Sequence, residues 1–122
     1  MRIFIASADS AFRLAVQLLI ESEPGIVTIG MFDRSEGLAS IVGSSHPEVL
    51  LLDYEITKQS TVGLISELFH LEAPPQIIVL SINSQVKEQV LAAGVNYFID
   101  KTFPPDELLP ILRRLRKPDV TH

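Results

Sequence analysis

The chain contains no cysteine, and other features that mark common classes of protein are missing as well. Without thiols it cannot form disulfide bonds, carry out thiol chemistry or bind zinc through cysteine. No apolar run is long enough to span a membrane, and the start of the chain lacks the pattern of a signal peptide. The net charge of −5 does not favour a nucleic-acid surface over the whole molecule. We therefore expect a cytoplasmic protein that binds neither membranes nor, directly, nucleic acid.

The composition is that of a packed globular domain. A chain of 122 residues, 47% hydrophobic and 20% charged, is long enough for one domain with its own core and too apolar to be disordered. It contains no internal repeat, low-complexity segment or internal linker. Its histidines, His46, His70 and His122, are scattered, so we expect no metal site built on histidine.

Residues Glu48–Asp53 form a short apolar run that ends at a carboxylate. An uninterrupted aliphatic run of this length is typical of a strand buried on both faces, as in the middle of a parallel sheet. In such sheets, ligands bind beyond the carboxyl ends of the strands. Asp53 stands at that end, where it is either a capping residue or a reactive group. The residues at the other strand ends are needed to choose between these.

Strand-like and helix-like segments alternate along the whole chain. Strands are expected at 3–6, 26–32, 48–53, 76–82 and 97–99, with helices at about 10–23, 38–42, 63–71, 85–93 and 104–116. The stretch 54–62 has little hydrophobic pattern and is expected to be a loop. This alternation predicts repeated right-handed βαβ units. The fold class is therefore α/β, a three-layer sandwich with a five-stranded parallel sheet and five helices.

Several residues indicate where the helices begin and end. Asp9 or Ser10 is a good N-cap for the first helix, and Gly94 suits a left-handed C-terminal cap for the fourth. Pro105 is tolerated in the first turn of the last helix, whereas Pro110 should bend or shorten that helix.

Polar side chains follow four of the five strands, at the edge where the carboxyl ends should meet. Residues 7–9 follow the first strand, and Asp53, Ser81 and Lys101 end or follow the third, fourth and fifth. A carboxylate, a hydroxyl and an ammonium group at one edge suit phosphoryl chemistry. The aspartate can attack phosphorus, while the other two groups bind the transferred oxygens.

These segments resemble a response-regulator receiver domain over about residues 2–115. The resemblance is carried by LLLD ending at Asp53, VLS ending at Ser81, AAGVNYF ending at Phe98 and IDK ending at Lys101. It implies a flavodoxin-like fold with strand order 2-1-3-4-5. It also implies a receiver domain at 1–117, followed at 118–122 by a tail or the start of a linker.

The resemblance implies a role for each residue at this edge. Asp53 would receive a phosphoryl group from a histidine kinase or phosphotransfer protein, and Ser81 and Lys101 would contact the phosphoryl oxygens. Ser81 and Phe98 would switch a surface that binds a downstream protein or output domain, although Phe98 can equally be a simple packing residue. The chain would then be a signalling module whose only reactions are its own phosphorylation and dephosphorylation.

The acidic pair that holds Mg²⁺ in receiver domains is missing. Its positions are Ser7 and Ala8, while Asp9 stands one place further along, where we expect it to cap the first helix. The remaining candidate ligands are Asp53 and the backbone carbonyl of Glu55, with the carboxylates of Asp9 and Glu55 as partial replacements for the missing pair. Because Mg²⁺ prefers an octahedral shell of oxygen ligands, we expect its binding to be weak or absent. A phosphorylation-independent pseudo-receiver that binds proteins is therefore the alternative function.

Two other departures from the family pattern concern loops. Thr102 replaces the proline that often follows the lysine, so we expect a trans peptide bond there. The loop 54–62 is about two residues longer than usual in the family.

Two other classes share parts of the pattern. Residues 53–57 resemble the Asp-x-Asp-x-Thr motif of haloacid-dehalogenase-like phosphatases. However, Glu55 replaces the second aspartate, and the motif stands at the end of the third expected strand, whereas in those phosphatases it ends the first. A flavodoxin-like electron carrier is disfavoured because loop 7–10 is poor in residues that bind a flavin phosphate.

The resemblance also suggests a partner surface on the fourth helix, fifth strand and fifth helix. It would include Val86, Val90 and Phe98. Leucines in the last helix exceed one buried stripe, so some of them could form a homodimer contact instead of core; these are Leu108, Leu109, Leu112 and Leu115. A basic cluster at 113–117 is expected to be a solvated helix end that favours the helix dipole.

Overall fold

The structure, a computed structural model, describes residues 1–57, 60–101 and 107–116. Five strands form one parallel sheet in the order β2-β1-β3-β4-β5. They are β1 Arg2–Ala6, β2 Val27–Phe32, β3 Val49–Asp53, β4 Gln76–Ser81 and β5 Tyr97–Asp100. The predicted fold class and strand order are confirmed.

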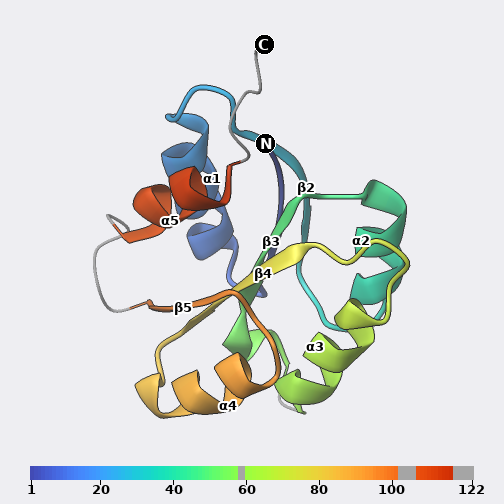
Figure 1. Ribbon diagram of the computed structural model, residues 1–122. Helices are drawn as coiled ribbons and strands as arrows, with labels where there is room; N and C mark the ends of the chain where they lie inside the picture. The colour runs from blue at the N-terminus through green and yellow to red at the C-terminus, as the bar shows by residue number, and fades with distance from the viewer. Residues whose placement is uncertain (58–59, 102–106, 117–122) are drawn as a thin grey trace.

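Five helices cover the two faces of this sheet. They are α1 Ser10–Glu21, α2 Leu38–Ser45, α3 Thr61–Phe69, α4 Lys87–Ala92 and α5 Leu108–Leu115, with short 3₁₀ turns η1 Tyr54–Ile56 and η2 Ser84–Val86. Helices α1 and α5 lie on one face, and α2, α3 and α4 lie on the other (Figure 1). No helix among the described residues is long and apolar enough to cross a membrane.

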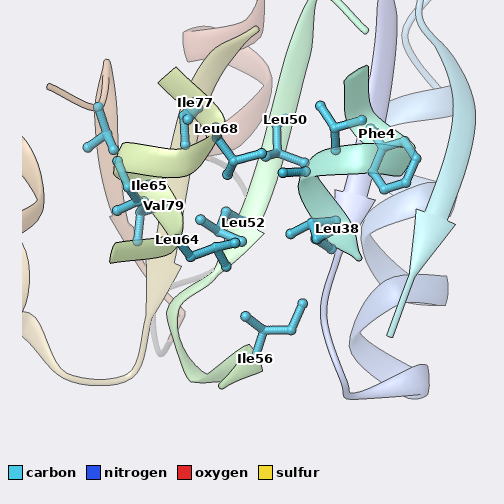
Figure 2. Packing of buried hydrophobic residues seen from close by; sticks show 14 of the residues in the cluster. Phe4, Leu38, Leu50, Leu52, Ile56, Leu64, Ile65, Leu68, Ile77 and Val79 are labelled. Carbon is cyan, nitrogen blue, oxygen red and sulfur yellow. The ribbon is translucent and has the colours of Figure 1, made fainter. Parts of the chain in front are cut away.

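Strand β3 lies at the centre of both layers of the core. All five of its residues are buried, and alternate side chains point to opposite faces of the sheet. Leu50 and Leu52 pack toward α2, α3 and α4, while Val49 and Leu51 pack toward α1 and α5. Figure 2 shows Leu50 and Leu52 between residues of α2 and α3. Burying one such side chain contributes about 1.5–3 kcal/mol. This burial on both faces fixes where β3 ends and therefore where Asp53 stands.

The segment after β3 differs from the predicted loop. Residues Tyr54–Ile56 form η1, and Asp53 caps this turn by accepting a hydrogen bond from the Glu55 N–H. Helix α3 begins at Thr61, two residues earlier than predicted, because the Ser60 hydroxyl caps it by accepting from the N–H of Gly63. Among the described residues, η1 and the first two residues of α3 therefore replace part of the expected loop.

The predicted helix caps are confirmed. The Asp9 carboxylate accepts from the Phe12 N–H and caps α1. Gly94, with a φ of 106°, follows α4, where the Gly94 and Val95 N–H groups bond to the carbonyls of Leu91 and Val90. This pair of bonds is a Schellman motif.

Pro110 is the third residue of α5, where an N–H group has no partner within the helix. Its ring is therefore accommodated in the first turn of the described helix. That Pro110 bends or shortens the helix stays a prediction. The predicted start of this helix at Pro104, Pro105 and the trans bond at Thr102 lie outside the described residues. So does the predicted tail at 118–122.

A register shift marks the edge strand β2. Ile3 pairs with Thr28 but Phe4 pairs with Gly30, so Ile29 is an extra residue in β2. This is a β-bulge. A Cβ atom on Gly30 would lie 2.7 Å from Cε2 of the buried Phe4 ring, which explains why glycine stands there.

We expect Gly30→Ala to lower the free energy of unfolding by about 1–3 kcal/mol, since the Phe4 ring must move to admit the new methyl group. The matched control is Gly63→Ala in α3, where the nearest atom lies 3.8 Å away. That change should stabilise the chain by about 0.4–1 kcal/mol, because alanine restricts the unfolded chain. Urea unfolding measures both, and a Gly30→Ala variant as stable as the parent would contradict the packing account.

Candidate functional site

The direction of side chains along the strands decides which residues meet at the carboxyl edge. In the register of β1 and β3, Ala6 pairs with Leu52, so Ser7 stands level with Asp53. By alternation, both side chains point to the face covered by α1 and α5. The Ser7 hydroxyl donates to Oδ2 of Asp53 at 2.6 Å, and both residues are buried. Sequence reasoning missed this bond, although the alternation of the two strands contains the signal for it.

Lys101 reaches Asp53 from the other side. It follows β5, on the same face as Ile99, and its Nζ lies 2.9 Å from Oδ1 of Asp53. The Lys101 N–H donates to the Ser81 carbonyl, and the ammonium group lies 4.6 Å from the centre of the Phe12 ring. The two charged side chains are only 13% and 4% exposed. Removing one member of so buried a pair typically costs about 3–5 kcal/mol.

Ser81 stands on the opposite face of the sheet from Asp53. It lies on the same face as Val79 and Ile77, which pack toward α2, α3 and α4, and it is fully buried. Its hydroxyl donates to Oε2 of Glu55 at 2.7 Å and accepts from the Asn83 N–H at 3.0 Å. Ser81 is therefore linked to the Asp53 side of the edge through Glu55.

The Glu55 carboxylate contacts hydrogen-bond donors at the ends of two strands, β4 and β5. Besides Ser81, the Ile82 N–H donates to its Oε1 at 3.1 Å, and Lys101 Nζ lies 3.6 Å from the same oxygen. The sequence suggested the backbone carbonyl of this residue as a metal ligand and its carboxylate as a partial replacement for the missing acidic pair, but it did not indicate the bonds to Ser81 and Ile82. The signal for the side chain was a second carboxylate two places after a strand-end aspartate. The structure thus gathers Asp53, Ser81 and Lys101 at one edge, as predicted, with Glu55 between them.

Both oxygens of Asp53 are held by donors. Oδ2 accepts from the Ser7 hydroxyl, and Oδ1 accepts from the Glu55 N–H and from Lys101. The Ser7 oxygen itself accepts from the Asp9 N–H at 3.1 Å, which orients its proton toward Asp53. These bonds fix the plane of the carboxylate. The arrangement can present an oriented oxygen nucleophile beside an ammonium group.

The carboxylates near Asp53 are already engaged in other bonds, which makes this edge a poor magnesium site. The Asp9 carboxylate caps α1, and the Glu55 carboxylate is bonded to Ser81, Ile82 and Lys101. Within the described ranges, no three His, Cys, Asp or Glu side chains gather as a metal site would require. Ser7 brings a hydroxyl that already donates to Asp53, and a hydrogen-bond donor turned to a carboxylate is a poor substitute for a ligand. The metal roles of Asp53, Asp9 and the Glu55 carbonyl stay predictions.

Phe98 lies on β5 opposite Val79 and is half-buried against the core layer under α2, α3 and α4. Its position is compatible with either of the two predicted interpretations. Its role as a switch with Ser81 stays a prediction.

The chain matches the family described as the response regulator receiver domain over residues 3–113. The transcriptional regulatory protein DltR of Streptococcus agalactiae is 28% identical over 115 residues, which are 93% of this chain and 50% of that protein. A protein-glutamate methylesterase/protein-glutamine glutaminase of Vibrio vulnificus is 24% identical over 102 residues, 80% of this chain and 30% of that protein. The chain spans half or less of the length of these relatives.

Solved structures share the fold at low identity. The response regulator domain of Thermotoga maritima CheB superposes with a TM-score of 0.84 at 18% identity, covering 97% of this chain and 98% of that one. RcsB of Salmonella enterica, solved bound to the promoter rprA with the phosphomimetic BeF₃⁻, gives 0.85 at 21% identity over 94% of this chain and 61% of that one.

We expect the unaltered chain to bind Mg²⁺ weakly and the double variant Ser7→Asp/Ala8→Asp to bind it at least about tenfold more tightly. Two added carboxylates beside Asp53 would repel one another by roughly 4 kcal/mol per pair at 4 Å and an effective dielectric constant of 20, and a divalent cation relieves this repulsion. Amide NMR during an Mg²⁺ titration gives both affinities.

The control is Ser7→Ala, which removes the hydrogen bond to Asp53 without adding charge. Its affinity for Mg²⁺ should stay within about threefold of that of the parent chain, because no carboxylate is added. Equal affinity in the parent and the double variant would show that Asp9 or Glu55 already supplies the metal site.

Proposed function

The chain belongs to the response regulator receiver domain family, and we propose that its Asp53 accepts a phosphoryl group from the phosphohistidine of a kinase or phosphotransfer protein. The observation that supports this most is the position of Asp53, held at the carboxyl edge of the sheet with Lys101 at 2.9 Å. A downstream protein or an output domain would bind the surface that changes when Asp53 is phosphorylated. A cytoplasmic location stays a prediction.

The transfer needs an oriented nucleophile and groups that receive charge on the phosphoryl oxygens. An oxygen of Asp53 bonds to phosphorus while the phosphorus–nitrogen bond of the donor breaks, and the histidine nitrogen keeps the electron pair of that bond. Lys101, the Ser81 hydroxyl and the Ile82 N–H can donate to the transferred oxygens. Donors already in place at the edge lose little freedom during the reaction.

Receiver domains generally use Mg²⁺ at their acidic pocket, where the ion neutralises charge between the aspartate and the phosphodonor. We propose that this chain depends less on the ion. Lys101 is the cation that the structure places at Asp53, and the Ser7 hydroxyl holds the other oxygen. Phosphorylation should consequently be slow and only weakly dependent on the metal.

A phosphorylation-independent protein-binding module is the second candidate. It is favoured by one observation, that Asp53, Glu55, Ser81 and Lys101 are already bonded to one another. The family match gives no comparable support to a haloacid-dehalogenase-like phosphatase or a flavodoxin-like electron carrier.

We place the partner surface on α4, β5 and α5. The leucines of α5 leave little for a homodimer, because Leu108 and Leu112 are buried while Leu109 and Leu115 pack partly buried against the core. Val86 and Val90, which were predicted to lie on this surface, are instead buried, whereas Leu91 of α4 is exposed on it. The dimer therefore stays a prediction.

Analytical ultracentrifugation at rising protein concentration, with and without a phosphodonor, tests the homodimer. If the dimer forms, the measured mass should rise to twice that of the monomer; a monomer mass under both conditions would rule out the contact.

We expect exposure to a small phosphodonor such as acetyl phosphate to add one phosphoryl group to the chain. Asp53→Asn should abolish the addition, because the amide lacks a nucleophilic oxygen anion. Lys101→Ala should slow it by about 10²–10³-fold, the usual cost of losing one donor to developing negative charge. The readout is the mass of the intact protein over time, with and without Mg²⁺. Phosphorylation that persists in Asp53→Asn would place the acceptor elsewhere, and none in the parent chain would favour the protein-binding module.

A further inference from the structure

Three donors meet at the carboxylate of Glu55, and each belongs to the edge where Asp53 would carry a phosphoryl group. The Ser81 hydroxyl donates at 2.7 Å, the Ile82 N–H at 3.1 Å, and Lys101 Nζ lies at 3.6 Å. A hydroxyl, a backbone N–H and an ammonium group are the kinds of donor that hold phosphoryl oxygens in proteins. Glu55 therefore uses the donors that the phosphoryl group would need.

The main chain on both sides of Glu55 is held in place. Its own N–H donates to Asp53, and the Tyr54 carbonyl accepts from the Thr61 hydroxyl at 2.9 Å. The next residue, Ile56, is buried in the core layer under α2 and α3, beneath Leu52 in the view of Figure 2. The turn therefore keeps the Glu55 carboxylate within reach of Ser81 and Lys101.

The side chain of Glu55 can nevertheless leave. It is 34% exposed, whereas the Asp53 side chain is 4% exposed. A rotation about its side-chain bonds would move the carboxylate into water without any change in the turn, because long side chains exchange rotamers readily at exposed sites. Ser81, Ile82 and Lys101 would then be available to another anion.

We propose that the Glu55 carboxylate is an internal occupant of the phosphoryl-binding pocket and gates phosphorylation of Asp53. The inference rests on the proposed function, since it assigns the phosphoryl group to that pocket. The phosphoryl group and the carboxylate carry the same sign of charge and compete for the same donors. Glu55 must therefore move out before or during transfer. It acts by position rather than by attack on phosphorus, so it is a positioning residue and not a catalytic one.

The test compares Glu55→Ala, Glu55→Asp and the parent chain. Aspartate keeps the negative charge but is one methylene, about 1.5 Å, too short to reach Ser81 and Lys101 together. If occupancy of the pocket limits the reaction, both variants should be phosphorylated by acetyl phosphate at least about tenfold faster than the parent chain. If charge alone repels the donor, Glu55→Asp should stay as slow as the parent. Glu67→Ala, an exposed acid in α3, controls for the loss of one negative charge.

A second readout does not require covalent transfer. Beryllofluoride, an anion that mimics a phosphoryl group, is titrated against each variant while the Ile82 amide is followed by NMR. The Glu55→Ala chain should bind it at least about tenfold more tightly than the parent, and Glu67→Ala should match the parent.

The outcomes separate this inference from the proposed function. Equal rates and affinities in the parent and in Glu55→Ala would overturn the gate while leaving phosphorylation of Asp53 intact. A slow Glu55→Asp beside a fast Glu55→Ala would replace occupancy with simple charge repulsion. Failure of every variant to bind beryllofluoride or accept a phosphoryl group would overturn both ideas, because opening the pocket would then have exposed no binding site.

Discussion

The contact between Asp53 and Lys101 is the interaction on which the functional edge depends. It spans β4, because the two residues end β3 and follow β5. With Glu55 included, two carboxylates share one ammonium group, so hydrogen bonds must hold the remaining negative charge. Ser7, Ser81 and the Ile82 N–H supply them. Loss of Lys101 would leave two partly buried carboxylates facing each other, which is costly at low local dielectric.

The apolar strand β3 makes this polar cluster possible. Its four buried aliphatic residues anchor the sheet to helices on both faces, and the strand then stops at a carboxylate. The free energy that holds Asp53 out of bulk water is supplied by those side chains rather than by the polar bonds themselves, each of which contributes about 1 kcal/mol net. The core thus fixes the position of Asp53, and the polar groups fix its orientation.

Much of this arrangement could be predicted because strand ends are strong signals. Apolar runs that stop at Asp53, Ser81 and Lys101 place these residues at one edge whatever the details of packing. The side-chain role of Glu55 was not predictable in the same way, because it depends on how the chain turns after β3. That turn is set by a capping bond from Asp53 and by the burial of Ile56, both tertiary features. The start of α3 could not be predicted for a similar reason. Several polar residues before it could have served as its N-cap, and only the structure shows that Ser60 does so.

The bulge at Ile29 has a consequence for contact between molecules. Strand β2 lies at one end of the sheet order, so the outer side of its backbone has no neighbouring strand within the described residues. An exposed edge of this kind invites pairing with another copy, and the exposed side chains of Val27 and Met31 add apolar surface to it. An extra residue breaks the regular spacing of N–H and C=O groups that an incoming strand would have to match. Gly30, which leaves room for the Phe4 ring, thus lies next to the bulge at Ile29, and this bulge hinders edge-to-edge pairing of the sheet with other copies.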